Sequence, residues 1–178
     1  MIEVEKKFRL TKRQRDAVVR RLPEIGAKLE GEEFEENILY SGEPIEAGVS
    51  ILRIRRVGKN ATLTYKKRIP GASSIKQRLE EETEVADPEA MAAILHALGF
   101  APALVYEKRR QTWRLGQTEI VIDVLPFGLF MEIEGRANQI KAVERKLGLN
   151  DLRAEHATYP QLTLKHGKTS NGLIESRF

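Results

Sequence analysis

Three pairs of glutamates in this chain are separated by a single residue: Glu3/Glu5, Glu80/Glu82 and Glu132/Glu134. In an extended strand, residues i and i+2 project from the same face about 7 Å apart, so each pair places two carboxylates side by side. At an effective dielectric of 20, such carboxylates repel by roughly 2 kcal/mol, which a neighbouring base or a bound cation must offset. No Cys or His lies near these pairs. Oxygen ligands of this kind favour a hard cation such as Mg²⁺ or Mn²⁺.

Basic residues follow the same alternating pattern and form a second set: Lys7, Arg53, Arg55, Lys66, Arg78, Lys108 and Arg110. The planar fork of arginine suits phosphate oxygens, which it can bind through two hydrogen bonds at once. Acids and bases together therefore indicate a site for a metal ion and a phosphorylated ligand. For any single residue of the two sets, the alternative is an internal ion pair or a charge that simply faces water.

The elements that carry these residues are expected to be strands, at residues 1–9, 37–40, 50–57, 61–68, 75–85, 103–115, 119–125 and 129–134. In nearly all of them, apolar and charged residues alternate, which is typical of a strand with one buried face. Gly58-Lys59-Asn60 predicts a tight hairpin between two of them. Asp123 faces away from the apolar residues of its strand.

Three helices are expected between the strands. Thr11 and Gln14 resemble a capping box, Asp87 caps a helix with Pro88 at its first position, and a third helix covers about 138–147. Their apolar stripes must pack on something, and the apolar strand faces are the available partner. The charged faces then either contact solvent or curl inward around a wet cavity, because eight or so antiparallel strands are enough to close a barrel. The pattern alone leaves both outcomes open.

Composition limits the class of protein. The chain has 178 residues, 41% hydrophobic and 31% charged, which suits one globular domain. The absence of cysteine excludes disulfides, thiolate metal sites and cysteine nucleophiles, and fits a cytoplasmic location. We expect no signal peptide and no membrane segment. Lys plus Arg (30) only slightly exceed Asp plus Glu (26), and the two signs are interleaved, so we expect no nucleic-acid partner.

The domain is expected to cover residues 1–164 and a polar, loose tail residues 165–178. The acidic run at residues 30–36 is interpreted as a solvated approach to the strand at 37–40.

Glu3-Val4-Glu5-Lys6-Lys7 resembles the E-x-E-x-K signature of the CYTH superfamily, the triphosphate tunnel metalloenzymes. Further motifs follow in the order of that family: Leu52-Arg53-Ile54-Arg55, Leu63-Thr64-Tyr65-Lys66, Arg78-x-Glu80-x-Glu82, Lys108-x-Arg110, Ile122-Asp123, and Gly128 to Glu134. They cover the chain from residue 1 to about 162. One E-x-E-x-K would be weak evidence, whereas the ordered set is specific.

The resemblance implies an α+β fold in which an eight-stranded antiparallel tunnel is flanked by helices. Lys and Arg would grip a linear triphosphate there, while glutamates hold one or two divalent ions, Mg²⁺ or Mn²⁺. It implies as phosphate ligands Lys7, Arg53, Arg55, Lys66, Arg78, Lys108 and Arg110. It implies as metal ligands Glu5, Glu132 and Glu134, supported by Glu3, Glu80, Glu82 and Asp123. Glu3, Glu5 and Lys7 are the expected catalytic residues.

One stretch departs from the family. Where relatives often have Asp-x-Tyr followed by an aromatic residue, this chain has Asn37-Ile38-Leu39-Tyr40. The roles of Asn37 and Tyr40 are therefore unsupported, and we expect the triphosphate grip to be unaffected.

The favoured function is a metal-dependent triphosphatase acting on thiamine triphosphate or inorganic triphosphate. The alternative is a class IV adenylate cyclase, which converts ATP to cyclic AMP and pyrophosphate with the same charged residues. A further alternative is a non-catalytic nucleotide- or polyphosphate-binding module. The sequence does not define the oligomeric state.

Overall fold

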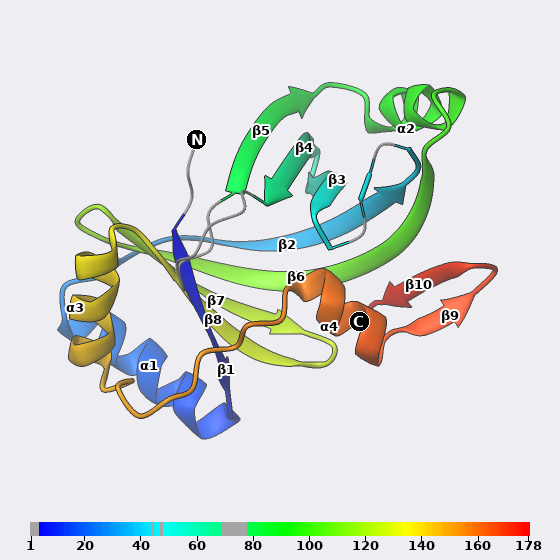
Figure 1. Ribbon diagram of the computed structural model, residues 1–178. Helices are drawn as coiled ribbons and strands as arrows, with labels where there is room; N and C mark the ends of the chain where they lie inside the picture. The colour runs from blue at the N-terminus through cyan, green and yellow to red at the C-terminus, as the bar shows by residue number, and fades with distance from the viewer. Residues whose placement is uncertain (1–3, 44, 47, 69–77) are drawn as a thin grey trace.

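The computed structural model describes residues 4–43, 45–46, 48–68 and 78–178 (Figure 1). Glu3, the side chain of Arg78 and the loop expected at 69–74 lie outside what is described. The elements are β1 Glu5–Leu10, α1 Lys12–Glu24, β2 Lys28–Ser41, β3 Ser50–Val57, β4 Asn60–Arg68, β5 Arg78–Val85, α2 Pro88–Ala97, β6 Ala101–Leu115, β7 Thr118–Leu125, β8 Gly128–Glu134, α3 Ala137–Leu147, α4 Tyr159–His166, β9 Lys168–Ser170 and β10 Leu173–Ser176.

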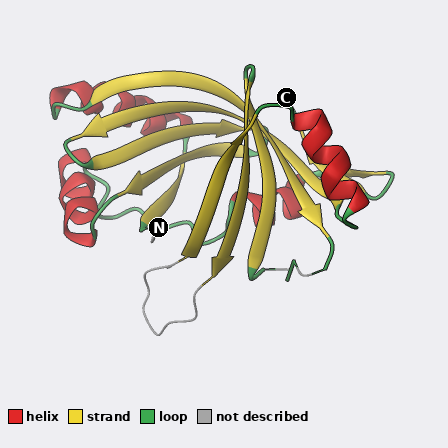
Figure 2. Ribbon diagram, turned by 90° about the horizontal axis from the view of Figure 1, so that it is seen from above, coloured by secondary structure: helices red, strands yellow, loops and turns green. Residues whose placement is uncertain are grey.

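Eight strands form one antiparallel path in the order β1-β8-β7-β6-β2-β3-β4-β5. The long strands β2 and β6 run through its middle, and the sheet curves strongly (Figure 2). Within the described residues, no ladder of hydrogen bonds joins β1 to β5, so the sheet is a tunnel-like, open curve. The expected α+β fold with eight antiparallel strands is confirmed.

The predicted hairpin is present as β3 and β4. Val57 pairs with Asn60, so Gly58 and Lys59 form the connection between the strands. Gly58 has a φ of +57°, a left-handed conformation that a two-residue hairpin turn requires and glycine adopts at little cost. The turn fixes the register, and the register decides which side chains face the hollow.

Helices cover the convex face of the sheet at both ends (Figure 1). Val18 of α1 and Val143 of α3 pack with Phe8 of β1 in one apolar core that also includes residues of β6, β7 and β8. Leu95 of α2 packs with Ile54 of β3 in a second core. The predicted division of nearly every strand into an apolar and a charged face is therefore confirmed, and these two apolar cores lie on the convex side.

A third apolar cluster lies on the concave side, where α4 packs. Tyr159 and Leu162 of α4 are buried with Leu39, Leu104 and Phe130. This helix was not among the three predicted, although Thr158 and Gln161 form a capping box at its start. It fills part of the hollow and leaves the remainder lined by charged residues.

Two sequence-based expectations are wrong. The acidic run at 30–36 belongs to the long strand β2, which pairs with β6 from Lys28 onward. The end of the chain is not loose, because β9 and β10 form a hairpin whose second strand pairs in parallel with β6 at residues 104–106. The polar composition of this segment suggested that it extends into solvent. Strand β10 nevertheless pairs with the open edge of β6 through backbone hydrogen bonds, which need no apolar side chains. Among the described residues, no helix has the length and apolar character needed to cross a membrane.

Candidate active site

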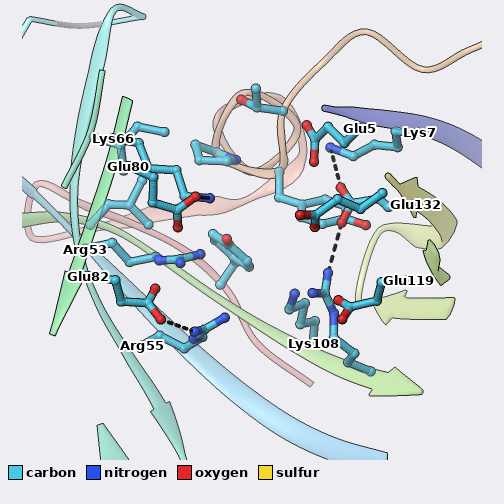
Figure 3. Close-up of a pocket in the computed structure, with 18 of the residues that line it drawn as sticks. Glu5, Lys7, Arg53, Arg55, Lys66, Glu80, Glu82, Lys108, Glu119 and Glu132 are labelled. Carbon is cyan, nitrogen blue, oxygen red and sulfur yellow. Dashed lines mark hydrogen bonds and ion pairs between the residues drawn. The ribbon is translucent and has the colours of Figure 1, made fainter. Parts of the chain in front are cut away.

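The concave face encloses a charged cavity of about 680 Å³ (Figure 3). Strands β3, β4 and β5 form one wall, β1, β7 and β8 form the facing wall, and β2 and β6 form the floor between them. Its lining includes Glu5, Lys7, Arg53, Arg55, Lys66, Glu80, Glu82, Lys108, Arg110, Glu132 and Glu134. Residues that lie far apart in the sequence therefore meet around one hollow.

On the wall formed by β1 and β8, Glu132 is held between two cations. Lys7 and Glu132 are opposite one another in the β1–β8 register, and Lys7 Nζ lies 3.1 Å from Glu132 Oε1. Arg110 Nη2 donates to the other oxygen, Glu132 Oε2, at 2.9 Å. Lys7 Nζ also lies 4.0 Å from the centre of the Tyr159 ring, a cation–π contact that fixes the ammonium near α4.

Behind this wall, Asp123 anchors two of the surrounding side chains. Arg110 donates to it through Nε at 2.8 Å and through Nη2 at 2.6 Å, a bidentate pair. The hydroxyl of Tyr159 donates to Asp123 Oδ2 at 2.7 Å. Asp123 is fully buried and does not line the cavity. Asp123 therefore forms an internal ion pair, which was the alternative to a role as metal ligand. We propose that Asp123 positions Arg110 and Tyr159 and does not bind metal.

On the floor, Glu35 connects β2 with β6. Its Oε1 lies 3.2 Å from Lys108 Nζ, and its Oε2 accepts a hydrogen bond from Asn37 Nδ2 at 3.3 Å. Glu35 is almost completely buried, whereas the sequence placed it in a solvated run. The strand register explains the difference, because Glu35 shares its parity with Asn37 and faces the hollow, while Glu36 faces outward to Arg56 and Arg177.

On the wall formed by β3, β4 and β5, cations again alternate with acceptors. Arg53 donates to Thr64 Oγ1 at 3.3 Å, and that hydroxyl donates to Glu82 Oε2 at 2.8 Å. Arg55 Nη2 donates to Glu82 Oε1 at 3.1 Å. Lys66 pairs with its cross-strand neighbour Glu80 at 2.8 Å. This wall thus presents three cations toward the cavity, as Figure 3 shows.

These contacts form one polar network that draws a residue from every strand of the antiparallel path: Lys7, Glu132, Asp123, Arg110, Glu35, Asn37, Arg53, Thr64 and Glu82. Buried charges are costly unless they are paired and hydrogen-bonded. The network meets that requirement and holds the cavity side chains in defined positions without a ligand.

Burial and charge shift the pKa values of several groups in this network. Burial opposes the ionisation of Asp123, but Arg110 and Lys108 outweigh it and hold the pKa of Asp123 below its ordinary value. The same balance, with Lys108 first among the cations, lowers the pKa of Glu35. Burial, reinforced by Arg110, lowers the pKa of Lys108. Burial and then Asp123 raise the pKa of Tyr159, so its hydroxyl remains a neutral donor.

A row of carboxylates crosses three strands at one end of the cavity. Glu134 of β8 pairs in register with Glu5 of β1 on one side and with Glu119 of β7 on the other. All three line the cavity, and like charges directly opposite in a sheet destabilise it unless a cation lies near. Glu119 has one such partner, Arg114, at 2.7 Å.

The donor chemistry of this row fits Mg²⁺ or Mn²⁺, which prefer carboxylate oxygens. Within the described part of the chain, however, no three acids or imidazoles converge as a ready-made metal cage. Mg²⁺ commonly uses one or two carboxylates and takes its remaining ligands from water and substrate phosphates. Glu5, Glu134 and Glu119 therefore fit a metal that binds together with the substrate.

Most of the residues expected from the sequence meet in this cavity, while Asp123 lies behind it. Glu3 and the side chain of Arg78 fall outside the described residues. The sequence did not single out four residues of the site, namely Glu35, Glu119, Tyr106 and Tyr159. For Glu35 and Glu119, the alternation of side chains along the strand could have indicated that they face the cavity. Glu119 has the parity of Asp123. Glu35 has the parity of Asn37 in β2, which begins nine residues before the predicted strand at 37–40.

Comparison with known proteins agrees with this architecture. Residues 1–166 match the CYTH domain. A protein of Methanocaldococcus jannaschii named "Putative adenylate cyclase MJ0240" is 32% identical over 151 residues, which are 83% of this chain and 84% of that protein. The solved PH1012 protein of Pyrococcus horikoshii OT3 is 27% identical, with a TM-score of 0.78 over 90% of this chain and 98% of that one.

A more distant structure is that of HpAC1 from Hippeastrum, which carries a dominant triphosphatase activity. It is 17% identical with a TM-score of 0.67, covering 88% of this chain and 92% of that one, and at this identity it shows the fold alone. The match over residues 1–166, together with the relative that is 32% identical, shows that this chain belongs to the CYTH domain family.

Proposed function

We propose that this protein is a divalent-metal-dependent enzyme that hydrolyses the terminal phosphate of a triphosphate substrate, such as inorganic triphosphate or thiamine triphosphate. The observation that carries the proposal is the charge of the cavity lining. Among the described lining residues, six are basic and seven are acidic. Such a cavity does not attract a polyanion by net charge, so tight binding of a triphosphate needs added positive charge, which a divalent ion would supply.

The cations have an arrangement that suits an extended polyanion. Arg53, Arg55 and Lys66 face the cavity from one wall, and Lys7 faces it from the other. Arg110 lines the cavity from β6 on the floor between them. Phosphate groups that bridge the walls would replace part of the existing ion pairs with charge-assisted hydrogen bonds. Because the network already orients these side chains, little reorganisation would accompany binding.

Phosphoryl transfer needs in-line positioning and positive charge where negative charge develops. A divalent ion bound by Glu5 and Glu134 would neutralise phosphate oxygens and lower the pKa of a bound water. Lys7 and Arg110 would stabilise the charge on the transferred phosphoryl group. Glu5 would orient the attacking water toward the terminal phosphorus.

Adenylate cyclase is the second candidate, favoured by the name of the Methanocaldococcus relative. In that reaction the 3′-hydroxyl of ATP attacks the α-phosphorus and pyrophosphate leaves. The same cations would serve both reactions, and the end of the substrate held near the nucleophile decides between them. A non-catalytic binding module is disfavoured by the many carboxylates that line the cavity.

One assay separates the three functions. The purified protein is incubated with inorganic triphosphate, thiamine triphosphate and ATP, with Mg²⁺ or Mn²⁺ and with excess EDTA as the metal-free control. Orthophosphate release supports the hydrolase, and cyclic AMP with pyrophosphate supports the cyclase. Saturable binding without turnover of any substrate would contradict an enzymatic role.

Arg53→Ala and Arg56→Ala provide a matched pair for this assay. The two arginines belong to the same strand, but Arg53 lines the cavity while Arg56 faces outward toward Glu36 and Glu89. We expect Arg53→Ala to weaken triphosphate binding and Arg56→Ala to leave it unchanged. Equal effects of the two variants would place the substrate elsewhere.

A further inference from the structure

A groove of about 510 Å³ lies in the middle of the convex face, where it is lined by residues of β2, β6 and β7 and by Arg15 of α1. Phe34 of β2 and Arg109 of β6 line this groove and are opposite one another in the strand register. Their neighbours Glu35 and Lys108 form an ion pair on the concave side. Because side chains alternate along a strand, the groove opens on the side of the sheet opposite to the charged cavity.

Two exposed aromatic rings lie at this groove. Phe34 is 47% exposed and Phe178 is 54% exposed, and their ring centres are 6.2 Å apart. Phe178 is held in position, because its backbone N–H donates to Glu107 Oε2 at 2.8 Å and Arg109 Cζ lies 5.0 Å from the centre of its ring. Rings that are already fixed lose little conformational entropy when a partner covers them. Neighbouring exposed apolar side chains of this kind are typical of a surface that binds another molecule.

The groove also carries an acid and a base that lack a partner of opposite charge. Glu32 Oε1 accepts a hydrogen bond from the neutral amide of Gln111 at 2.7 Å, and within the described part of the chain no cation pairs with Glu32. Arg109 contacts the Phe178 ring, and no carboxylate of the described residues pairs with it. Both charged side chains are exposed.

These two charges indicate which kind of partner fits the groove. A partner surface with a single sign of charge would attract one of them and repel the other. A second copy of this chain presents both signs. If a two-fold axis runs between Glu32 and Arg109, each Glu32 faces the Arg109 of the other copy, so both ion pairs form at once.

We propose that the convex groove is a two-fold interface between two copies of this chain. The rings of Phe34 and Phe178 form its apolar part, and Glu32 of each copy pairs with Arg109 of the other. The charged cavities of both copies stay accessible, because they open on the other side of each sheet. This interface is independent of the proposed enzymatic function.

The first test measures the mass of the full chain in solution by sedimentation equilibrium over a dilution series. The unmodified protein is compared with Phe34→Glu and with Leu98→Glu. Leu98 is the matched control, because it is also an exposed apolar residue, at 66%, but it follows α2 and does not line the groove. We expect a dimer that Phe34→Glu dissociates and Leu98→Glu leaves intact. Circular dichroism checks that each variant is folded.

Charge reversal tests how the two copies are arranged. Glu32→Arg places like charges opposite one another at both ion pairs of the dimer, and Arg109→Glu does the same with the other sign. We expect each variant by itself to raise the dissociation constant of the dimer by about tenfold, since two-fold symmetry repeats every loss. An equimolar mixture of the two variants should restore a dimer with one copy of each, because opposite charges then meet at both positions.

A chain that is monomeric at every concentration would overturn the interface and leave a different protein as the partner of this groove. A dimer that Phe34→Glu leaves intact would also overturn it, because the contact would then lie elsewhere. A mixture that associates no more tightly than either charge variant alone would overturn the pairing of Glu32 with Arg109. None of these measurements uses turnover, so failure of the proposed function would not alter their outcome.

Discussion

Asn37 on β2 accepts a hydrogen bond from Arg53 on β3, with 3.3 Å between Oδ1 and Nη1. Its amide nitrogen donates in turn to Glu35 at 3.3 Å. Asn37 is fully buried, so both bonds form away from competing water. The departure from the family pattern therefore contacts one residue of the cation set, and the expectation that the triphosphate grip is unaffected stays a prediction. Tyr40, in contrast, packs in the convex core under α2.

The contact between Asn37 and Arg53 can be tested with a double-mutant cycle. Asn37→Ala removes the acceptor that orients Arg53, and we expect it to weaken triphosphate binding by about tenfold, the order of one buried hydrogen bond. Arg53→Ala should have a larger effect, because it removes the cation itself. If Asn37 acts through Arg53, the double variant will bind no more weakly than Arg53→Ala alone.

Binding and turnover are expected to separate between the two walls. Glu132→Gln removes a carboxylate held by Lys7 and Arg110, and it should lower kcat more than it raises the dissociation constant of ATP. Arg53→Ala should do the reverse. Steady-state kinetics combined with equilibrium binding checks both variants, and a parallel loss of both quantities in either one would refute this division.

The carboxylate row predicts how metal dependence responds to substitution. Glu5→Gln and Glu134→Gln each remove one negative oxygen from the row, so we expect each variant to need a higher Mg²⁺ concentration for half-maximal activity. Binding of Mn²⁺, followed by electron paramagnetic resonance in the presence of inorganic triphosphate, gives a readout independent of turnover. Glu89→Gln is the control, since Glu89 lies outside the cavity and is largely exposed.

The buried acids predict a loss of stability in acid. The folded-state pKa values of Asp123 and Glu35 lie below their unfolded values of about 3.9 and 4.3. Their stabilisation is therefore fully present above those unfolded values and is lost as pH falls through the folded ones. We expect the free energy of unfolding, measured with urea, to be nearly constant from about pH 7 to 5 and to decrease below about pH 4.

Asp123→Asn tests the source of this pH dependence. The substitution leaves Arg110 and Lys108 with one buried carboxylate fewer, which should cost about 3 kcal/mol at neutral pH. The variant should also show a smaller decrease of the free energy of unfolding below about pH 4 than the unmodified protein. An unchanged decrease would show that other carboxylates control the transition.

The C-terminal hairpin predicts that the last residues contribute to stability. Removal of residues 168–178 deletes the strand paired with β6, and we expect a loss of about 2 kcal/mol, the order of a few backbone hydrogen bonds. Arg177→Ala should cost less, about 0.5 kcal/mol, because its ion pairs with Glu36 and Glu107 are partly exposed. A truncated chain with an unchanged melting temperature would contradict a structural role for the hairpin.

Local pattern was enough to predict most elements and their faces. In a strand, alternate side chains must project to opposite sides, so the parity of Glu5 and Lys7 already separated them from Phe8. The turn at Gly58 likewise determined the register of β3 and β4. Both features depend on residues close together in the chain, which is why the sequence reveals them.

Other features depended on which strands become neighbours. The same parity could have left every charged face in solvent, and only the order β1-β8-β7-β6-β2-β3-β4-β5 with its curvature brings Lys7 and Arg53 around one cavity. The burial of Glu35 follows from the pairing of β2 with β6 over its whole length. Sequence by itself determined the face on which each charge lies, while tertiary structure decided which charges meet, because long-range strand pairing is set by the packing of the whole sheet.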